Sequence, residues 1–280
     1  MSGPLVTAAW LAERLGRDDL QVVDATWYMP TEEGSGAADH MAGHIPGAAF
    51  FDLDAIADQA TDLPHMLPAP ADFAAAAGAL GLRRDADIVV YDARGMFSSP
   101  RVWWTLRTMG FPRVFVLDGG LAAWRAAGGA VETKPAQPAP TRLSARFRPE
   151  LVRSLDQVRA VLDASAAQLV DARSPGRFRG ETPEPRAGVR SGHMPGACNL
   201  HYAELLNADG TMKPPEALRA AFEAADVDLD APIVTTCGSG VTAAILALAL
   251  ARLGRDDVPV YDGSWTEWGG RGDTPVVTGP

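Results

Sequence analysis

The chain has 280 residues with 47% hydrophobic and 21% charged side chains, which is the composition of an ordinary globular protein and excludes a disordered one. Its length suits two domains of roughly 100 to 150 residues each. The formal net charge of −10 argues against nucleic acid or an anionic membrane surface as a partner, and no apolar run approaches the roughly 20 residues of a membrane span.

The predicted elements alternate between helices and strands along the chain. A capped helix is expected to begin near Thr7, and the N-terminal residues do not show the pattern of a secretory signal. In the first half we expect a strand at 86–93, a helix at 99–110 and a strand with a turn at 113–120. In the second half the matching pieces are a strand at 232–237, a helix at 241–254 and a strand at 258–263. This order predicts an α/β fold of mostly parallel sheets with helices on both faces.

The same plan occurs twice in the chain. HIPGAAFFDL begins at His44 and HMPGACNLHY at His193, an offset of 193 − 44 = 149. VLDGGLAAW at 116–124 is matched by VYDGSWTEW at 260–268, an offset of 260 − 116 = 144. Repeated segments in the same order indicate a duplicated domain. We therefore expect an N-terminal domain at 1–135, a Pro/Ala-rich linker at 136–150 and a C-terminal domain at 151–280.

The chain contains two cysteines, Cys198 and Cys237. Two thiols do not make a disulfide framework and favour a reducing compartment, so we expect a cytoplasmic protein. Cys198 follows the HMPGA turn, where a small apolar side chain would pack, and it fits an inert residue.

Cys237 stands in CGSGVT, between a β-branched strand and an Ala/Leu helix. At such a turn, free backbone N–H groups and the positive end of the helix converge on an anion, and the same field favours a thiolate over a thiol. We therefore predict Cys237 as a nucleophile, in a cradle formed by Gly238, Gly240, Val241 and Thr242. In the first copy Asp92 aligns with Cys237, and an aspartate does not carry a transferable sulfur. Only the second copy is expected to catalyse.

The duplicated domain, the HxPGA turns, the six-residue cysteine loop and YDGSWTEW resemble the tandem rhodanese-domain sulfurtransferases, over nearly the whole chain. Within that family, CGSGVT is most similar to the loop of the members that use 3-mercaptopyruvate. The resemblance implies that Cys237 receives sulfur as a persulfide while pyruvate leaves. It also implies a proton relay of Ser239, His65 and Asp54, and it implies Arg177 and Arg186 as the pair that holds the substrate carboxylate.

The residues after the cysteine bear on the sulfur donor. Thiosulfate is a small dianion and favours basic residues directly after the cysteine, whereas Gly238 and Ser239 are uncharged. In 3-mercaptopyruvate the carboxylate is some atoms away from the sulfur and needs a guanidinium of its own. The long loop at 171–197 offers five, which are Arg173, Arg177, Arg179, Arg186 and Arg190. We expect at least three of them to be solvated surface charges.

No metal or organic cofactor is expected, because Cys and His nowhere show the spacing of metal ligands. The expected partners are a small-molecule sulfur donor and a thioredoxin-like or other thiol acceptor, with cyanide as an alternative acceptor. Two rival functions stay open, a thiosulfate:cyanide sulfurtransferase and a persulfide carrier without its own small-molecule donor. A cysteine phosphatase is disfavoured, because its loop needs an arginine six residues after the cysteine and that position is Ala243.

Overall fold

The structure is a computed structural model that describes residues 3–136 and 138–280, and it divides the chain into two compact units. Unit 1 consists of Met1–Ala60, Leu67–Arg148 and Ala208–Met212, and unit 2 consists of Thr61–Met66, Pro149–Asn207 and Lys213–Pro280. Each unit therefore includes one short segment from the other half of the sequence. The expected domain limits at 135 and 151 stay a prediction, and the two short segments are a feature that the sequence does not show.

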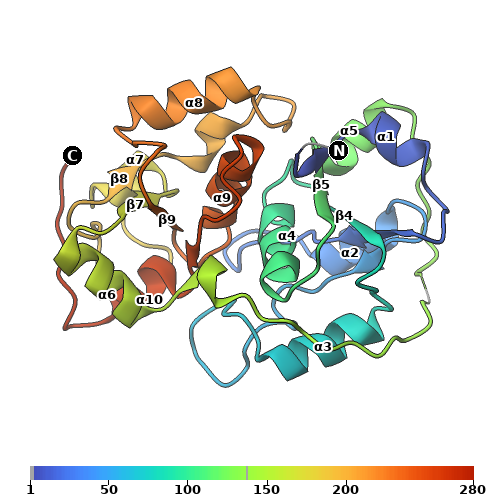
Figure 1. The fold of residues 1–280 in the computed structure, drawn as a ribbon, viewed down its shortest axis with the longest axis horizontal. Coiled ribbons are helices and arrows are strands. Elements are labelled where there is room, and N and C mark those ends of the chain that lie inside the picture. The colour runs from blue at the N-terminus through green and yellow to red at the C-terminus, as the bar shows by residue number, and fades with distance from the viewer. Residues whose placement is uncertain (1–2, 137) are drawn as a thin grey trace. The chain divides into compact units, whose positions relative to one another are not determined.

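Unit 1 consists of a sheet and the helices around it (Figure 1). Its strands are β1 (Leu5–Val6), β2 (Leu20–Asp24), β3 (Ala49–Phe50), β4 (Asp87–Tyr91) and β5 (Val114–Leu117). Its helices are α1 (Ala8–Ala12), α2 (Gly36–Ala42), α3 (Pro70–Ala79), α4 (Ser99–Thr108) and α5 (Gly120–Ala126). Helix α1 begins at the predicted position, because the Thr7 hydroxyl accepts the Trp10 N–H at 3.2 Å and satisfies a free donor of the first turn.

Unit 2 repeats this plan. Its strands are β6 (Val152–Arg153), β7 (Gln168–Asp171), β8 (Cys198–Asn199), β9 (Ile233–Thr236) and β10 (Val260–Tyr261). Its α-helices are α6 (Leu155–Ala164), α7 (Pro175–Phe178), α8 (Pro215–Ala224), α9 (Ala243–Arg252) and α10 (Ser264–Gly270), with short 3-10 helices η1 (Pro149–Leu151) and η2 (Tyr202–Leu205). The strands and helices expected in both halves are present, each shorter by a few residues at its ends.

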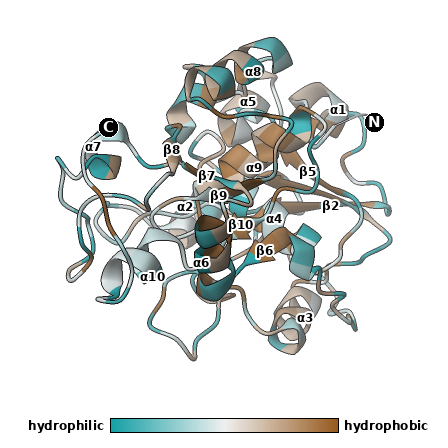
Figure 2. Cartoon of the chain, turned by 60° about the vertical axis from the view of Figure 1, so that its left-hand side comes forward, coloured by the Kyte–Doolittle hydropathy of each residue, from teal (hydrophilic) through white to brown (hydrophobic). Residues whose placement is uncertain are grey.

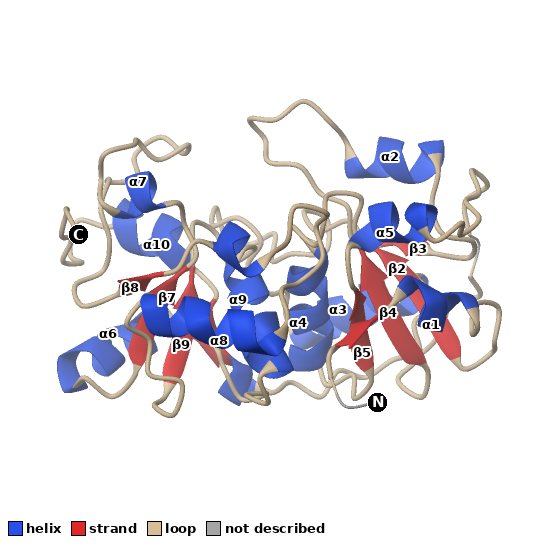
Figure 3. Ribbon diagram, turned by 90° about the horizontal axis from the view of Figure 1, so that it is seen from above, coloured by secondary structure: helices blue, strands red, loops and turns tan. Residues whose placement is uncertain are grey.

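The two sheets have the same topology. In the described residues the strand orders are β1-β5-β4-β2-β3 and β6-β10-β9-β7-β8, and every pair is parallel. Figure 3 shows the strands of each unit side by side with helices around them. This arrangement confirms the predicted duplicated α/β fold. Strands β4 and β9 are each the middle strand of five, so the loop after each lies at the centre of the carboxyl edge of its sheet, where such sheets bind ligands.

Helices cover both faces of the sheet in unit 2. Figure 1 shows α8 and α9 on one side of the strands and α6 and α10 on the other. Helix α9 is coloured as apolar in Figure 2, and its residues Ala243–Ala251 are all buried. Helix α6 is amphipathic instead, and its Leu155 and Val158 join the core under the sheet. Because α9 is buried on all sides, its N-terminus, which follows Cys237, is held rigidly.

The helices of the described segments, 3–136 and 138–280, are also too short or too polar to cross a lipid bilayer.

Candidate active site

Cys237 lies where the middle strand β9 meets the buried helix α9, as the sequence predicted. Cys237 is only 2% exposed. Gly240 has the left-handed φ of 78°, which a glycine adopts without strain, and this turn brings the short loop into the first turn of α9. Thr236, the residue before the cysteine, is in register with Asp171 on the neighbouring strand β7. The long arginine loop that starts after Asp171 therefore begins beside Cys237.

The first residues of α10 hold the peptide units of the cysteine loop. Trp265 donates its N–H to the Cys237 carbonyl at 2.9 Å, and Thr266 donates both its N–H (2.9 Å) and its hydroxyl (2.6 Å) to the Gly238 carbonyl. The Cys237 N–H donates to the Ser264 hydroxyl oxygen at 3.3 Å. Sequence reasoning missed Ser264 and Thr266, although both lie in the repeated YDGSWTEW segment. These bonds direct the two carbonyls toward α10 and fix the orientation of the loop.

Four backbone N–H groups of the loop are available to an anion. In the part of the chain that the structure describes, no acceptor takes the N–H of Gly238, Ser239, Val241 or Thr242. Ser239 and Val241 are 8% and 3% exposed, so these donors are largely shielded from bulk water. Unpaired N–H groups at the N-terminus of a rigid helix stabilise negative charge. The loop thus offers the donors that a thiolate or a persulfide needs.

Arg177, one of the two predicted carboxylate ligands, lies directly against this loop. Its Nη2 is 2.9 Å from the point at which a Cβ on Gly238 would stand, and its Nη1 is 3.8 Å from that point. The Arg177 side chain is 22% exposed, and its guanidinium is paired with Glu184. Arg186 is half-buried in the same loop, and its role stays a prediction.

The expectation that at least three of the five loop arginines are solvated is wrong. Arg173 is 2% exposed and bonds to Asp171 and Glu184. Arg190 is half-buried, and its guanidinium donates to the carbonyls of Trp268, Gly269 and Thr274. Arg177, Arg179 and Arg186 are half-buried, and the Arg179 side chain pairs with the exposed Glu181. The loop folds back over unit 2, so its guanidinium groups satisfy oxygens that burial would otherwise leave without donors.

The predicted proton relay is divided between the two units. His65 lies in Thr61–Met66 and therefore belongs to unit 2, which also contains Cys237 and Ser239. It is 6% exposed and has the left-handed φ of 62°, which is uncommon for a residue other than glycine. Asp54 belongs to unit 1, where its carboxylate accepts the Trp27 indole N–H at 2.8 Å. A relay through Ser239, His65 and Asp54 stays a prediction.

His201 is a titratable group near Arg177 that sequence reasoning missed. It directly precedes η2, and its ring meets that of Tyr202 edge to face. Burial lowers the pKa of His201 below its usual value, against the opposing effect of Glu204 and together with the positive charge of Arg177. His201 is therefore neutral at pH 7 and adds no positive charge beside Arg177.

The two histidines of the HxPGA turns have matching contacts in the two units. Nδ1 of His44 is 2.6 Å from the carbonyl oxygen of His40, and Nδ1 of His193 is 2.9 Å from that of Phe178. The His44 ring also stacks on the His40 ring, and the His193 ring stacks on the Phe178 ring. The ring centroids are 3.8 and 3.7 Å apart. Such contacts give both histidines a structural role in their turns.

Asp92 occupies the position in unit 1 that Cys237 has in unit 2. Its carbonyl accepts the Leu121 N–H at 2.9 Å, as the Cys237 carbonyl accepts that of Trp265. The Asp92 carboxylate accepts the N–H groups of Arg94 (2.8 Å), Ser98 (3.1 Å) and Ser99 (2.8 Å). The first repeat therefore fills its own anion site with a side-chain carboxylate.

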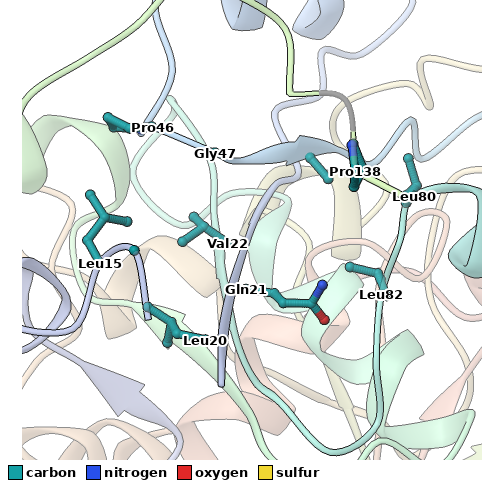
Figure 4. A pocket seen from close by; sticks show the side chains of 11 residues that line it. Leu15, Leu20, Gln21, Val22, Pro46, Gly47, Leu80, Leu82 and Pro138 are labelled. Carbon is teal, nitrogen blue, oxygen red and sulfur yellow. The ribbon is translucent and has the colours of Figure 1, made fainter. Parts of the chain in front are cut away.

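Unit 1 also contains a cavity of about 190 Å³, shown in Figure 4. Of the polar side chains, only Gln21 lines it, and its amide is already bonded to the Gly81 carbonyl (2.8 Å) and the Arg83 N–H (2.7 Å). None of the described residues around it is ionisable, so this cavity offers nothing to hold an anionic sulfur donor. Residues 3–136 and 138–280 also contain no cluster of three or more His, Cys, Asp or Glu side chains suited to a metal ion.

The fold and the site define a duplicated α/β protein in which one repeat carries a cysteine before the N-terminus of a buried helix and the other repeat carries an aspartate at the matching position. Both repeats match the model of the Rhodanese-like domain, at residues 7–127 and 154–271. The chain belongs to the rhodanese-like family, as its motifs predicted.

Relatives of this chain have names that refer to two sulfur donors. The chain is 43% identical to the 3-mercaptopyruvate sulfurtransferase of Escherichia coli K12, over 97% of this chain and 96% of that protein. It is also 43% identical to the thiosulfate sulfurtransferase of Bos taurus, over 94% of this chain and 91% of that protein. The crystal structure of SseA, a 3-mercaptopyruvate sulfotransferase from E. coli, covers 94% of this chain and 99% of its own at 41% identity, with a TM-score of 0.87. Overall sequence identity does not distinguish between 3-mercaptopyruvate and thiosulfate as the sulfur donor, so the donor has to be inferred from the residues of the site.

Proposed function

We propose that the chain is an enzyme that moves sulfur from 3-mercaptopyruvate through a persulfide on Cys237 to a thiol acceptor and releases pyruvate. The observation that carries this proposal is the place of Arg177, whose guanidinium lies against Gly238 while the loop itself carries no charge at Gly238 or Ser239. The site therefore offers a forked carboxylate ligand beside the cysteine loop and no basic side chain within it.

The chemistry follows from this arrangement. The Cys237 thiolate attacks the sulfur of 3-mercaptopyruvate, an S–S bond forms, and the C–S bond breaks with its electron pair passing to the carbon of the pyruvate enolate. The enolate takes up a proton and leaves as pyruvate, and the outer sulfur stays on Cys237 as a persulfide. An acceptor thiolate then attacks the outer sulfur and regenerates the Cys237 thiolate.

Each predicted site residue has a defined role in this proposal. Arg177 and Arg186 hold the carboxylate, and the N–H groups of Gly238, Ser239, Val241 and Thr242 stabilise the negative sulfur in the turn that Gly240 makes. Ser239, with His65 and Asp54, handles the proton that the enolate needs. A thioredoxin-like dithiol is the acceptor that we propose. We also propose the cytoplasm as the compartment, supported by the two free cysteines of the described chain.

The deciding experiment measures pyruvate release and intact mass after the reduced protein is mixed with 3-mercaptopyruvate, in parallel with thiosulfate. We expect one added sulfur atom per chain and one pyruvate per sulfur. Cys237→Ser should lose both, whereas Cys198→Ser, which removes the other thiol, should keep both.

Two results would replace the proposal by one of its rivals. A higher kcat/KM for thiosulfate than for 3-mercaptopyruvate would make the chain a thiosulfate:cyanide sulfurtransferase. Unchanged sulfur transfer from a protein persulfide in a double Arg177→Ala, Arg186→Ala variant, together with no loading by either small donor, would make it a persulfide carrier.

A further inference from the structure

Two arginines and two carboxylates form a continuous ion-pair cluster behind the cysteine loop. Arg173 bonds to Asp171 at 2.7 Å and to Glu184 at 2.9 Å. Glu184 also bonds to Arg177, with Oε2 2.5 Å from Nη2 and Oε1 3.3 Å from Nε. The cluster therefore runs from strand β7, through Glu184, to the guanidinium that lies against Gly238.

The inner half of this cluster is fixed. The Arg173 side chain is 1% exposed, its guanidinium lies 4.4 Å from the centre of the Trp265 ring, and its Nη2 donates to the Gly192 carbonyl at 2.9 Å. Burial opposes the charged form of Arg173, but the carboxylates of Asp171 and Glu184 outweigh this effect and raise its pKa. Arg173 is thus a permanent cation that holds one oxygen of Glu184.

The outer half of the cluster orients Arg177. The Glu184 side chain is 4% exposed and engages Nε and Nη2 of Arg177, on one side of the guanidinium. In the described chain no protein acceptor takes Nη1, so the edge formed by Nη1 and Nη2 keeps donors for a substrate. An Arg177 held in this way does not have to give up side-chain entropy when a carboxylate binds.

Glu184 also sets the net charge. Two guanidinium groups and two carboxylates sum to zero, and the neutral His201 adds nothing. The cluster therefore offers directed hydrogen-bond donors and adds no net positive charge of its own to that of Arg186. This environment suits a monoanionic carboxylate that matches the fork, and it disfavours a compact dianion, which is attracted mainly by net positive charge.

We propose that Glu184 is a positioning residue that selects the sulfur donor: it holds Arg177 for the carboxylate of 3-mercaptopyruvate and cancels the charge that would attract thiosulfate. This inference rests on the proposed function, because it assumes that Arg177 binds the carboxylate of the donor. It goes beyond that function in assigning donor choice to a residue that contacts neither the cysteine loop nor, in the proposal, the substrate.

The test compares three variants with the wild-type protein. Glu184→Gln removes the charge and places an amide N–H₂ against guanidinium donors. Glu184→Asp keeps the charge but is too short to reach both arginines. Glu181→Gln is the matched control, because it removes one carboxylate from the same loop, where the exposed Glu181 pairs with Arg179 and not with the cluster. For each protein kcat and KM are measured with 3-mercaptopyruvate and with thiosulfate, and thermal unfolding is followed alongside.

We expect Glu184→Gln to raise KM for 3-mercaptopyruvate about tenfold with a much smaller change in kcat, and to shift the ratio of kcat/KM values toward thiosulfate by at least about tenfold. The shift should shrink at high salt, because the added net charge is screened. Glu184→Asp should raise KM for 3-mercaptopyruvate without a gain in thiosulfate use. Glu181→Gln should match the wild type with both donors.

Several outcomes would overturn the inference. An equal loss with both donors in Glu184→Gln would mean that Glu184 only supports the fold, and an equal ratio shift in Glu181→Gln would mean that any charge in the loop has this effect. If Glu184→Gln does not fold, Glu184→Asp decides the role of charge, because this variant keeps the carboxylate. A rise of its kcat/KM for thiosulfate by the same factor as its fall for 3-mercaptopyruvate would refute that role. A wild-type protein that takes no sulfur from 3-mercaptopyruvate would refute the proposed function itself, whereas a normal wild type with an unchanged donor ratio in the variants refutes only the role of Glu184.

Discussion

Nη2 of Arg177 lies 2.9 Å from the position that a Cβ on Gly238 would occupy. Any side chain at residue 238 therefore competes for space with the guanidinium that we assign to the substrate carboxylate. The absence of a side chain next to Cys237 thus has a steric reason as well as an electrostatic one, because it lets Arg177 approach the loop.

The first prediction concerns this contact. Gly238→Ala should lower kcat/KM for 3-mercaptopyruvate about five- to tenfold, which corresponds to roughly 1 to 1.4 kcal/mol, because the flexible guanidinium has to move from its binding position. Steady-state kinetics on pyruvate release measure this. Gly272→Ala is the control, because a Cβ at Gly272 meets nothing within 4 Å. Wild-type kcat/KM in Gly238→Ala would show that the position of Arg177 does not matter.

A second prediction concerns Ser264, which has the left-handed φ of 52°. Its counterpart in the first repeat, at 264 − 144 = 120, is Gly120 with a φ of 58°. Ser264→Gly should relieve backbone strain of about 1 kcal/mol, yet leave the buried Cys237 N–H without its acceptor. Ser264→Ala loses the same hydroxyl but keeps the strain, so we expect the melting temperature of Ser264→Gly to be at least as high as that of Ser264→Ala. Persulfide formation should be about tenfold slower than in the wild type for both variants. Calorimetry and rapid-quench pyruvate measurements check the two parts, and wild-type persulfide formation in Ser264→Gly would contradict the positioning role of the hydroxyl.

The third prediction separates stability from activity through Asp92. Asp92→Asn replaces a carboxylate that accepts three backbone N–H groups, one in the turn after β4 and two at the start of α4, so it should cost about 1 to 3 kcal/mol of stability. Sulfur transfer should stay within about twofold of the wild type, because Cys237 lies in the other unit. Urea unfolding and steady-state kinetics on the same preparations test both statements. Asp72→Asn, at an exposed carboxylate in the first turn of α3, serves as the control and should change stability by no more than about 0.5 kcal/mol. A large loss of activity in Asp92→Asn without a loss of stability would contradict a purely structural role of Asp92.

A fourth prediction uses the pH dependence of the second thiol. Burial, and then the Asp226 carboxylate, raise the pKa of Cys198 above its usual value. A raised pKa keeps the thiol protonated at pH 8, so alkylation should be slow there and should accelerate only above the ordinary thiol range near 8.5. The same shift means that Cys198 stabilises the fold below the unfolded-state pKa, and that this contribution is lost as the pH rises through the folded-state pKa.

Iodoacetamide labelling of the Cys237→Ser variant, followed by intact mass against pH, isolates Cys198. Asp226→Asn should move the labelling curve to lower pH, and asparagine suits the left-handed φ of 56° at this position. A labelling curve like that of the unfolded chain would contradict the predicted shift.

The sequence by itself was enough to predict the duplicated α/β fold, the family and the place of Cys237. These features depend on local patterns: β-branched runs predict strands, a capped and then apolar stretch predicts a helix, and two glycines after a strand predict an anion-binding turn. The repeat added an internal comparison, because Asp92 and Cys237 occupy matching turns and only one of them can carry sulfur.

The tertiary structure decided the features that depend on contacts between distant residues. The solvation expected for the loop arginines was wrong because burial of Arg173 and Arg190 depends on how the loop at 171–197 folds onto α10 and the C-terminal segment, which no local pattern encodes. The assignment of His65 to the unit of Cys237, the hydroxyl of Ser264 under the cysteine and the link from Arg173 through Glu184 to Arg177 have the same origin. Each of them joins residues that are far apart in the sequence or on different elements, so their partners are determined only when the chain packs.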